Sequence, residues 1–310
     1  MPETEGKVVL LVGPTCVGKT GASIELARRL DTEIVSADSM QIYRHMDIGT
    51  EKPSPGQLAR VRHHMVDIVE PWETYSAGRY VEDARPIMDG LHGRGRVPIV
   101  TGGTGLYIKA MTRGLFKGPG ADWRLRGELR GESTGALHAR LRQEDPETAD
   151  LVAPDDRRRI IRALEVCALT GRRMSEVKRE LTEPLPYDFA KVALSRDREE
   201  LYPMIEGRVE EMMRRGLLGE VERVLAMNPS RTAMQAIGYK ELKGYLEGEY
   251  SLGEAVSLIK RNTRRYAKRQ FTWFRSEEGL RWVDVTGVFD PLEIAGMLLP
   301  ALVDSGLDLQ

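Results

Sequence analysis

The sequence lacks several features, and each absence excludes a class of protein. Its 310 residues include only two cysteines, Cys16 and Cys167, which cannot form a zinc site by themselves and would stay reduced in the cytosol. No apolar run approaches the length that crosses a bilayer, which excludes a membrane-spanning protein. The amino-terminal MPETEGK is acidic and leads straight into an apolar run, unlike a signal peptide. We therefore expect a cytoplasmic protein with no membrane partner.

An excess of charge of either sign is also missing. Lysine and arginine number 46 and aspartate and glutamate 47, which leaves a net charge of −1. Such a chain has no overall attraction for nucleic acid, so any attraction must come from local clusters of positive charge. Hydrophobic residues make up 41% and charged residues 30%, a normal balance for a globular protein of one large domain or two smaller ones.

Short apolar runs alternate with helical patterns in both halves of the chain. KVVLLVG, TEIVSADS and RVPIV are typical of buried strands, and TGASIELARRL and YSAGRYVEDARPIMDGLHGRG of helices. Between the breaker-rich segments 116–122 and 182–188 the chain is charged and helical, after which KVALSRD and LRWVDVTG predict further strands. The pattern predicts an α/β fold with a parallel sheet flanked by helices (1–116 and 187–310) and a helical insertion domain (117–186).

The segment GPTCVGKT matches the P-loop pattern G-x-x-x-x-G-K-[ST] through Gly13, Gly18, Lys19 and Thr20. Backbone N–H groups of such a loop point at an anion, the lysine adds positive charge, and the Thr20 hydroxyl can bind Mg²⁺. Strand, loop and helix follow in the required order, which favours phosphate binding over a chance glycine turn, although Cys16 is best explained as a small filler. The predicted phosphate site is Gly13, Pro14, Thr15, Cys16, Val17, Gly18, Lys19 and Thr20.

The acid that usually follows a second strand and holds Mg²⁺ in P-loop ATPases is missing. VPIV runs into Thr101-Gly102-Gly103-Thr104 instead, and the only acid in a comparable place is Asp38, after TEIVSA. Because ligands bind at the carboxyl edge of open α/β sheets, Asp38 could bind Mg²⁺, act as a general base, or merely cap a helix. Thr104 could bond a substrate at the same edge or belong to a plain turn. The missing acid favours a diphosphate that is not necessarily a nucleotide's.

One long helical pattern concentrates positive charge and reads SLGEAVSLIKRNTRRYAKRQFTWFR. It begins with a capping box from Ser251 to Glu254. Helical spacing predicts one basic side and an opposite, core-facing side made of Ala255, Ile259, Tyr266 and Trp273. A solvated charged face is the common explanation, but six cations without an acid favour contact with an RNA backbone. The six are Lys260, Arg261, Arg264, Arg265, Lys268 and Arg269.

A second basic cluster lies in APDDRRRIIRALEVCALTGRR. Its arginines fall in the first turns of a predicted helix, where the helix dipole disfavours cations. The cluster is explained by contact with RNA phosphates, by the lid of a phosphotransferase that closes on ATP, or by a plain exposed helix. Its members are Arg157, Arg158, Arg159 and Arg162.

Taken together, these stretches resemble the bacterial tRNA dimethylallyltransferases, also called tRNA isopentenyltransferases. The matching stretches are GPTCVGKT, SADSMQIYRHMDIGTEKP, HHMVDIVEP, TGGTGLYIKA, DDRRRIIRALEVCALTGRRMSE, MQAIGYKEL and AKRQFTWFR. The resemblance implies a P-loop NTPase-like core and a monomeric enzyme that uses Mg²⁺. It also implies transfer of a dimethylallyl group from dimethylallyl diphosphate to N6 of the adenosine 3′ of the anticodon, in tRNAs that read codons beginning with U. No cysteine follows Cys167, so the chain resembles the bacterial type without a zinc finger.

The resemblance also implies roles for individual residues. The P-loop would hold the diphosphate with Mg²⁺ near Thr20, and Asp38 would be the base that accepts a proton. Arg208, in MIEGRVEEMMRRGLLGEV, would approach the reaction centre and complete a catalytic set with Asp38, Lys19 and Thr20. The implied tRNA contacts, in the anticodon stem-loop, are Asp38, Ser39, Met40, Gln41, Thr104, Arg126, Arg158, Arg159, Ile160, Ile161, Arg162, Gln235, Ala236, Ile237, Gly238, Tyr239 and Lys240.

Two other functions remain open from the residues alone. A small-molecule or nucleotide kinase would use the arginine-rich helix as a lid and would transfer a phosphoryl group from ATP. A non-enzymatic, GTP-dependent RNA-binding switch would require the guanine-recognition motif N-K-x-D, which the sequence lacks.

Overall fold

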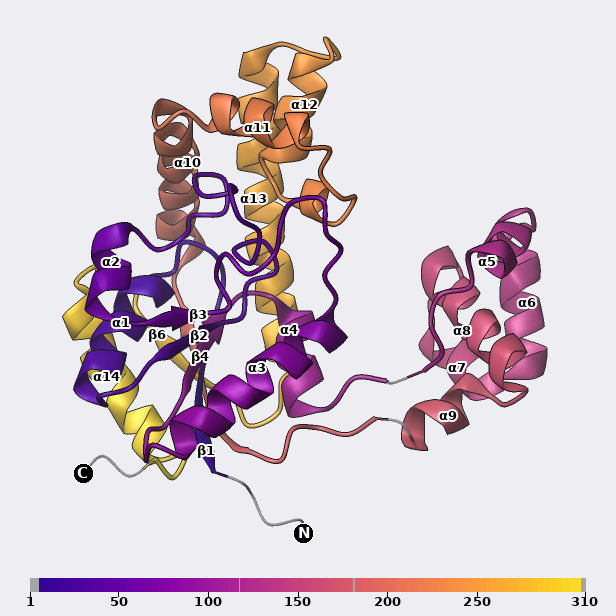
Figure 1. Ribbon diagram of the computed structural model, residues 1–310, viewed down its shortest axis with the longest axis horizontal. Coiled ribbons are helices and arrows are strands. Elements are labelled where there is room, and N and C mark those ends of the chain that lie inside the picture. Colours follow the sequence, from indigo (N-terminus) through magenta and orange to yellow (C-terminus); the bar gives the residue numbers. More distant parts are fainter. Residues whose placement is uncertain (1–5, 117, 181, 308–310) are drawn as a thin grey trace. The chain divides into compact units, whose positions relative to one another are not determined.

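The computed structural model of the chain describes residues 6–116, 118–180 and 182–307 (Figure 1). The chain divides into two compact units, a core made of Met1–Lys109 and Pro186–Gln310 and an insertion made of Ala110–Leu185. The insertion therefore begins within α4 (Gly105–Thr112), just before the breaker-rich segment 116–122. No helix in the described part of the chain combines the length and the apolar character that crossing a membrane requires.

The described core contains a sheet of six strands in the order β3-β2-β4-β1-β5-β6, and every neighbouring pair is parallel. This confirms the predicted parallel α/β fold, which in sequence order uses β1 (Lys7–Val12), β2 (Ile34–Ser36), β3 (His63–His64), β4 (Ile99–Gly102), β5 (Asp188–Ser195) and β6 (Arg281–Asp284). The P-loop strand β1 lies between β4 and β5, with Val12 beside Gly102 on one side and Ala193 on the other. The P-loop that follows β1 therefore starts from the middle of the sheet.

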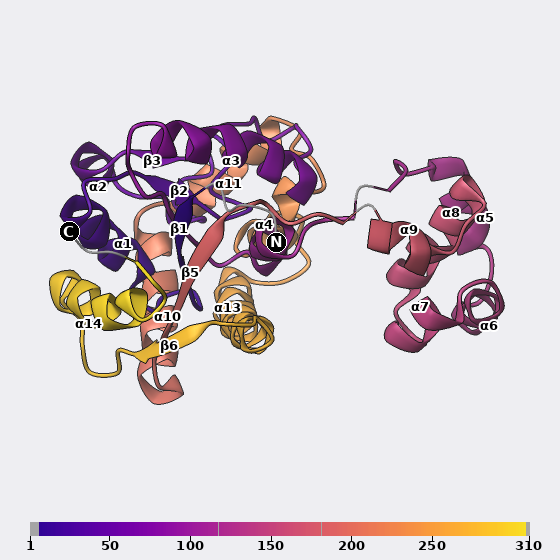
Figure 2. The same ribbon diagram turned by 90° about the horizontal axis from the view of Figure 1, so that it is seen from below.

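Helices cover both faces of the sheet (Figure 2). On one face lie α1 (Lys19–Arg29) and α14 (Pro291–Val303), which pack against each other. On the other lie α4 and α13 (Leu252–Arg275), and α13 opens with the predicted capping box from Ser251 to Glu254. The amino-terminal part of the core also contains α2 (Pro55–Arg60) and α3 (Ala77–His92).

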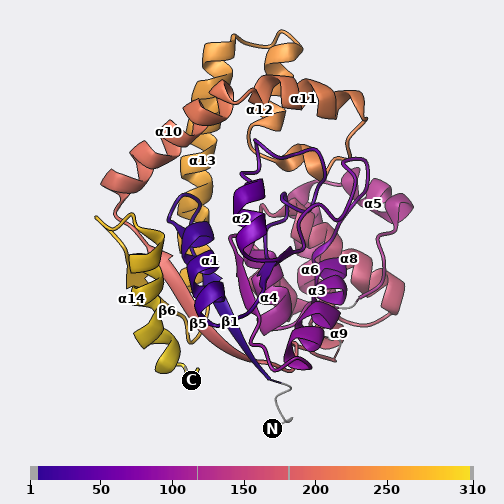
Figure 3. The same ribbon diagram turned by 60° about the vertical axis from the view of Figure 1, so that its left-hand side comes forward.

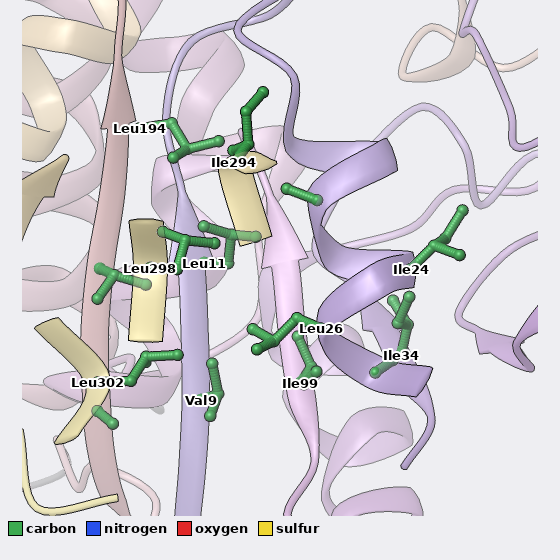
Figure 4. Packing of buried hydrophobic residues seen from close by; sticks show 14 of the residues in the cluster. Val9, Leu11, Ile24, Leu26, Ile34, Ile99, Leu194, Ile294, Leu298 and Leu302 are labelled. Atoms are coloured by element: carbon green, nitrogen blue, oxygen red, sulfur yellow. The ribbon is translucent and has the colours of Figure 1, made fainter. Parts of the chain in front are cut away.

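A continuous hydrophobic core holds the P-loop region in place (Figure 4). Leu11 of β1 and Leu26 of α1 are fully buried, as is Leu298 of α14, the one helix in this cluster that the sequence pattern did not indicate. Burying a side chain of this size contributes about 1.5–3 kcal/mol, so α1 is fixed firmly on the sheet. The cluster also contains Val9, Ile24, Ile34, Ile99, Leu194, Ile294 and Leu302.

Beyond the carboxyl edge of the sheet the chain forms a helical region (Figure 3). It consists of α10 (Arg198–Arg214), α11 (Leu217–Ala226), the 3-10 helix η1 (Ala233–Gln235), α12 (Tyr239–Leu246) and α13. Helix α13 packs against both α10 and α12, so one long helix ties this region to the sheet.

The described residues of the insertion form helices and no strand, as the sequence pattern indicates. The helices are α5 (Trp123–Arg130), α6 (Thr134–Glu144), α7 (Pro146–Leu151), α8 (Arg157–Thr170) and α9 (Met174–Glu180). Their own core contains Leu129, Leu137 and Leu141 together with Ile160 and Ile161 of α8. The insertion is therefore built on a hydrophobic cluster that is separate from that of the core.

Candidate active site

A pocket of about 290 Å³ lies at the carboxyl edge of the sheet, where β1, β2 and β4 end. The P-loop contributes residues 15–20, and Asp38 follows β2 on the same pocket wall. Arg208 of α10 reaches the pocket as well, so the structure brings together all four predicted catalytic residues. Other lining residues are Ser36, Gln41, Thr50, Glu51, Lys52, Pro53, Thr101, Gly102, Gly103, Tyr266 and Gln270.

Glycine is required at both ends of the P-loop. Gly13 has a φ of 143°, and a Cβ there would lie 2.7 Å from the carbonyl oxygen of Leu194, which forbids a side chain. Gly18 has a φ of 110° and precedes α1 without a side-chain cap on the first helical N–H groups. Uncapped N–H groups at a helix start attract an anion. Pro14 is buried beside Gly13 and does not line the pocket.

Lys19 is held by uncharged partners. Its Nζ donates to the carbonyl oxygens of Gly13 at 2.9 Å and Pro14 at 2.6 Å. Burial, and then the positive charge of Arg208, lower the pKa of Lys19 to about 8. The charge of Asp38 acts in the opposite direction, but no described carboxylate forms an ion pair with Lys19, so the ammonium is available to an anion in the pocket.

Cys16 and Val17, between the two glycines, serve as packing residues. The Cys16 side chain is 5% exposed and packs against Leu201, Ile205 and Ala267. Burial raises the pKa of its thiol, which therefore stays protonated and unreactive. A small apolar filler at this position is what the sequence indicates.

Asp38 accepts backbone hydrogen bonds through one oxygen. Its Oδ1 accepts from the N–H groups of Met40 at 2.8 Å and Gln41 at 3.3 Å, within a turn rather than at a helix start. Burial raises the pKa of this carboxyl, against the opposing effects of the two amides and of Lys19. A carboxylate with a raised pKa accepts a proton more readily, so the geometry is compatible with a general base.

Thr104 and Ser39 join the ends of β4 and β2. The Thr104 hydroxyl oxygen accepts from the Ser39 N–H at 2.9 Å and donates to the Ser39 hydroxyl at 3.3 Å. Gln41 shapes the pocket wall, since its amide nitrogen donates to the carbonyl oxygens of Thr50 and Glu51 at 3.2 and 3.0 Å. These three predicted tRNA contacts therefore have a clear role within the protein.

Gln270 of α13 is a site residue that the sequence analysis missed. Its Oε1 accepts from the Thr15 N–H at 2.9 Å, and its Nε2 donates to the carbonyl oxygen of Gly103 at 2.9 Å, so it fixes the P-loop against the end of β4. Arg208 donates to the Thr15 hydroxyl at 3.4 Å. The available signal was a glutamine on the helix side that buries Ala267 and Phe274.

Two side chains that line the pocket offer oxygen ligands to a metal ion. They are the hydroxyl group of Thr20, which is exposed, and the carboxyl group of Asp38. Hydroxyl and carboxylate oxygens are ligands that Mg²⁺ accepts, together with phosphate oxygens and water. The described residues contain no group of three His, Cys, Asp or Glu side chains placed to hold a metal.

Most of the predicted arginine contacts in the insertion are engaged within it. Arg126 forms a bidentate pair with Glu165, at 2.7 and 2.8 Å, and Arg162 bonds the same carboxylate at 2.5 Å. Burial opposes the charge on Glu165, but these two arginines outweigh burial and lower its pKa. Arg158 and Arg159 of α8 are exposed, and Arg159 pairs with Asp156 at 3.3 Å.

Two further predicted RNA contacts in α8 point into the insertion. The side chains of Ile160 and Ile161 are only 0% and 6% exposed, and both belong to the hydrophobic cluster. The stretch 235–240 is similarly mixed. Gln235 and Lys240 are exposed and Ile237 is partly exposed, whereas the buried members are Ala236, Gly238 and Tyr239.

The basic side of α13 is divided between two environments, which corrects the single basic surface that the sequence predicts. Lys260 pairs with Glu210 of α10 at 2.6 Å, and Arg264 pairs with Glu206 of the same helix. The sequence could not show these acids because they lie about fifty residues earlier in the chain. An open groove with a volume of about 650 Å³ is lined by Arg265, Lys268, Arg269, Thr272, Trp273 and Ser276.

The prediction that Trp273 belongs to the core is wrong. Its side chain is 37% exposed, and its ring lies against Gly105, where an added Cβ would come within 2.4 Å of the indole. Tyr266 is partly exposed and lines the pocket, whereas Ala255 and Ile259 are buried as predicted. The start of α4 therefore approaches the Trp273 ring closely, and the ring is still partly exposed. The groove therefore combines three cations with an accessible aromatic ring.

Comparison with known proteins gives consistent matches over nearly the whole chain. The family described as IPP transferase matches residues 41–277, and the family described as isopentenyl transferase matches residues 6–69. The chain is 48% identical over 306 residues to a tRNA dimethylallyltransferase of Thermodesulfovibrio yellowstonii, covering 96% of this chain and 97% of that protein. It is 50% identical over 284 residues to a tRNA dimethylallyltransferase of Syntrophobacter fumaroxidans, covering 89% and 83%.

Solved structures agree with these sequence matches. The tRNA isopentenylpyrophosphate transferase of Bacillus halodurans superimposes with a TM-score of 0.72 at 40% identity, covering 97% of this chain and 98% of that one. A eukaryotic dimethylallyltransferase acting on tRNA gives a TM-score of 0.82 at 26% identity, covering 98% and 80%. Similarity of this extent reaches both the core and the insertion.

Proposed function

The chain belongs to the IPP transferase family, and we propose that it transfers a dimethylallyl group from dimethylallyl diphosphate to an adenosine of tRNA. One observation carries the proposal, namely that a P-loop and a carboxyl group with a raised pKa face the same pocket. The P-loop suits a diphosphate, and the carboxyl group suits a nucleophile that must lose a proton. We propose N6 of the adenosine 3′ of the anticodon, in tRNAs that read codons beginning with U, as the acceptor.

The diphosphate would bind in the P-loop as both handle and leaving group. When the bond between C1 and oxygen breaks, its electron pair moves to the diphosphate, which gains negative charge. The uncapped N–H groups at the start of α1, the ammonium of Lys19 and the guanidinium of Arg208 can stabilise that charge. Because Lys19 and Arg208 are bonded to uncharged groups, neither charge is cancelled before the substrate arrives.

Asp38 would act on the acceptor. The exocyclic amine of adenine is a poor nucleophile because its lone pair is delocalised into the ring. As the new bond between N6 and C1 forms, the amine proton passes to the Asp38 carboxylate, whose raised pKa favours that transfer. The allylic carbon reaches this exchange through a loose, cation-like state.

Magnesium would complete the donor site. The Thr20 hydroxyl would hold the ion together with oxygens of the diphosphate, on the evidence that Thr20 faces the pocket at the start of α1. Bound there, Mg²⁺ would neutralise part of the charge of the leaving diphosphate.

The anticodon stem-loop would approach through charged and aromatic surfaces. The groove on α13 supplies Arg265, Lys268 and Arg269 for phosphates and the open ring of Trp273 for stacking. In the insertion, Arg158 and Arg159 are the exposed arginines among the predicted contacts. The target base must leave its stack to reach Asp38, as it does in other enzymes that modify bases.

The relatives and solved structures described above do not favour a kinase, because their names are tRNA dimethylallyltransferase, tRNA isopentenylpyrophosphate transferase and dimethylallyltransferase acting on tRNA. We further propose that the enzyme acts as a cytoplasmic monomer, as the resemblance to the bacterial tRNA dimethylallyltransferases implies.

Mass spectrometry of nucleosides tests the proposal directly. Purified protein, tRNA, dimethylallyl diphosphate and Mg²⁺, without any nucleotide, should yield dimethylallyl-adenosine and an equal amount of pyrophosphate. Product that forms only with ATP, or transfer of the ATP γ-phosphate to an acceptor, would contradict it. The same digest locates the modified adenosine and so tests the position next to the anticodon.

A further inference from the structure

One wall of the pocket is an irregular loop between β2 and α2, residues 37–54. It has no place in the sheet ladder apart from a single bridge between Tyr43 and Val69, yet it lines the pocket through residues 50–53. Irregular segments hold a fixed shape only where other groups satisfy their backbone N–H and C=O groups. The loop 37–54 therefore needs such partners to keep its shape.

Glu220 of α11 binds the loop through three successive backbone amides. Its Oε2 accepts from the N–H groups of Asp47 at 2.9 Å and Ile48 at 2.8 Å, and its Oε1 accepts from that of Gly49 at 2.9 Å. Glu220 is only 2% exposed. Successive N–H groups that converge on one point form a nest for an anion, and here the protein supplies the anion itself.

The same carboxylate reaches the stretch 235–240. Tyr239, the first residue of α12, donates its hydroxyl to Oε1 of Glu220 at 2.5 Å. The loop is pressed against this tyrosine, because a Cβ on Gly49 would lie 2.5 Å from the Tyr239 ring and 2.9 Å from the Leu217 side chain. One buried group thus joins the loop to a stretch that we propose contacts tRNA.

Within the loop, hydrogen bonds continue from the clamped segment to Asp38. Residues 50 and 51, directly after the clamped amides, accept from the Gln41 side chain at 3.2 and 3.0 Å. The Gln41 N–H in turn donates to Oδ1 of Asp38 at 3.3 Å. The position of the proposed base is therefore linked to the clamped residues 47–49 at the other end of the loop, whereas the P-loop is fixed separately through Gln270.

We propose that Glu220 is a positioning residue for prenyl transfer, which holds the loop 37–54 in the shape that sets Asp38 against the acceptor base. This rests on the proposed function. Glu220 acts through the loop and touches neither substrate. Its loss should therefore slow the chemical step while the P-loop keeps its hold on the diphosphate. A merely structural residue would lower both together as the fold weakens.

Glu220→Gln is the sharpest variant. Glutamine keeps the length of the side chain but replaces one carboxylate oxygen with an NH₂ group. Each carboxylate oxygen accepts from two of the four donors, so two buried donors would face another donor and lose their partner. We expect the single-turnover rate at saturating tRNA and donor to fall by roughly ten- to a hundredfold. The dissociation constant for inorganic pyrophosphate with Mg²⁺, measured by calorimetry, should stay within about twofold of the wild-type value, because the P-loop is untouched.

Two further variants separate the two ends of the clamp. Tyr239→Phe removes only the hydroxyl and leaves the loop amides on Glu220, so we expect a smaller loss of rate than in Glu220→Gln. Gly49→Ala forces a Cβ against the Tyr239 ring from the opposite side and should reproduce the larger loss with pyrophosphate binding intact. The exposed Glu222, on the same helix, gives the matched control Glu222→Gln, which should behave as wild type.

Several outcomes would overturn the proposal. A wild-type rate in Glu220→Gln would do so, as would an equal loss of rate and pyrophosphate affinity. Should the variant not fold, amide hydrogen exchange of the intact wild-type protein decides: rapid exchange at Asp47, Ile48 and Gly49 would contradict the clamp. A wild-type protein that binds pyrophosphate but transfers no prenyl group would instead refute the proposed function.

Discussion

The core and the insertion treat their charged side chains in opposite ways. Around the pocket of the core, Lys19 and Arg208 donate to carbonyl and hydroxyl oxygens, and Asp38 accepts from backbone amides. In the insertion, Arg126 and Arg162 both bind the carboxylate of Glu165. A charge held by uncharged dipoles remains available to a ligand, whereas an ion pair is already neutralised and its partners are committed.

This difference shows that counting arginines in a sequence overestimates the charge that a nucleic acid can use. The sequence pattern of α8 and α13 suggested ten basic contacts, but acids neutralise several of them. These acids are Glu165 on α8 itself and Glu206 and Glu210 on α10. What remains is local, in the groove on α13 and at the exposed arginines of α8. Five experiments test the contrast, from the largest expected effect to the smallest.

Asp38→Asn should have the largest effect, because it removes the proton acceptor and leaves the surrounding charges in place. We expect the single-turnover rate of prenyl transfer to fall by roughly two to four orders of magnitude, with tRNA affinity nearly unchanged. Rapid-quench measurement of product at saturating substrates gives the rate, and a filter-binding titration gives the affinity. A wild-type rate would remove Asp38 from the mechanism.

Lys19→Ala should remove a positive charge whose attraction for the diphosphate grows as the diphosphate leaves and gains negative charge. We expect a rate lower by about a hundred- to a thousandfold, together with a higher KM for dimethylallyl diphosphate. Steady-state kinetics over a range of donor concentrations separate the two effects. A change in KM alone would mean that Lys19 binds the ground state and the transition state equally well.

Glu165→Gln should damage the insertion and spare the core. It leaves Arg126 and Arg162 without their buried partner, and breaking such a pair costs about 3 kcal/mol. Folding lowers the pKa of Glu165, so its ion pairs stabilise the wild-type insertion at pH values above the usual pKa of glutamate. This stabilisation is lost as the pH falls through the lowered pKa. Hydrogen exchange resolved along the chain should show weaker protection in the insertion alone.

The matched control is Glu128→Gln, since Glu128 forms an exposed pair with Arg124 at 3.3 Å. An exposed pair contributes about 0–1 kcal/mol, so exchange should barely change. Equal effects of the two variants would contradict the contrast between buried and exposed pairs.

Replacing Arg265, Lys268 and Arg269 with glutamine should weaken tRNA binding without regard to sequence. Each lost phosphate contact should flatten the slope of log affinity against log salt by about 0.9, the coefficient for duplex DNA. Lys260 and Arg264, which are paired with acids of α10, give the matched control and should change the slope less. Equal slopes for the two variants would show that an ion pair with an acid of α10 does not prevent a cation from contacting the RNA.

The smallest effect concerns pH. Lys19 has a lowered pKa of about 8, so its ammonium form is lost as the pH rises through that value in the free protein. Pyrophosphate affinity should therefore fall above pH 8, by at most about tenfold for each pH unit. Calorimetry between pH 7 and 9 measures the change, which Lys19→Ala should abolish. A pH-independent affinity in the wild type would place the binding charge elsewhere.

Local pattern was sufficient for the P-loop and for the order of strands and helices. Gly13, Lys19 and the apolar run before them carry their signal within one short segment. The clamp formed by Glu220 could not be predicted, because Glu220 and its amide partners lie 171 to 173 residues apart in sequence. Strand β3 has only two residues, too few for any periodic pattern.

The two errors on α13 have related causes. Helical spacing places Trp273 on the apolar side, but it cannot show that the glycine start of α4 approaches the ring while the residue stays 37% exposed. Helical spacing also predicts an apolar residue at position 270, on the buried side. Gln270 stands there instead, and it bonds both the P-loop and the end of β4, which helical spacing cannot show. In each case the decisive neighbour lies on another element.

The position of the insertion in the chain has a consequence for biosynthesis. β1 leaves the ribosome before the other strands. One of its two neighbours in the sheet is β5, which pairs with β1 from Lys7 to Val12 but follows the whole insertion in sequence. The hydrophobic cluster of the insertion, by contrast, draws only on residues between Leu125 and Met174. Because domains form as their contacts emerge, we expect the insertion to fold on the growing chain before the phosphate loop gains its final support. Nascent chains arrested when Leu185 has left the ribosome and β5 has not should resist protease in the insertion and yet bind no pyrophosphate.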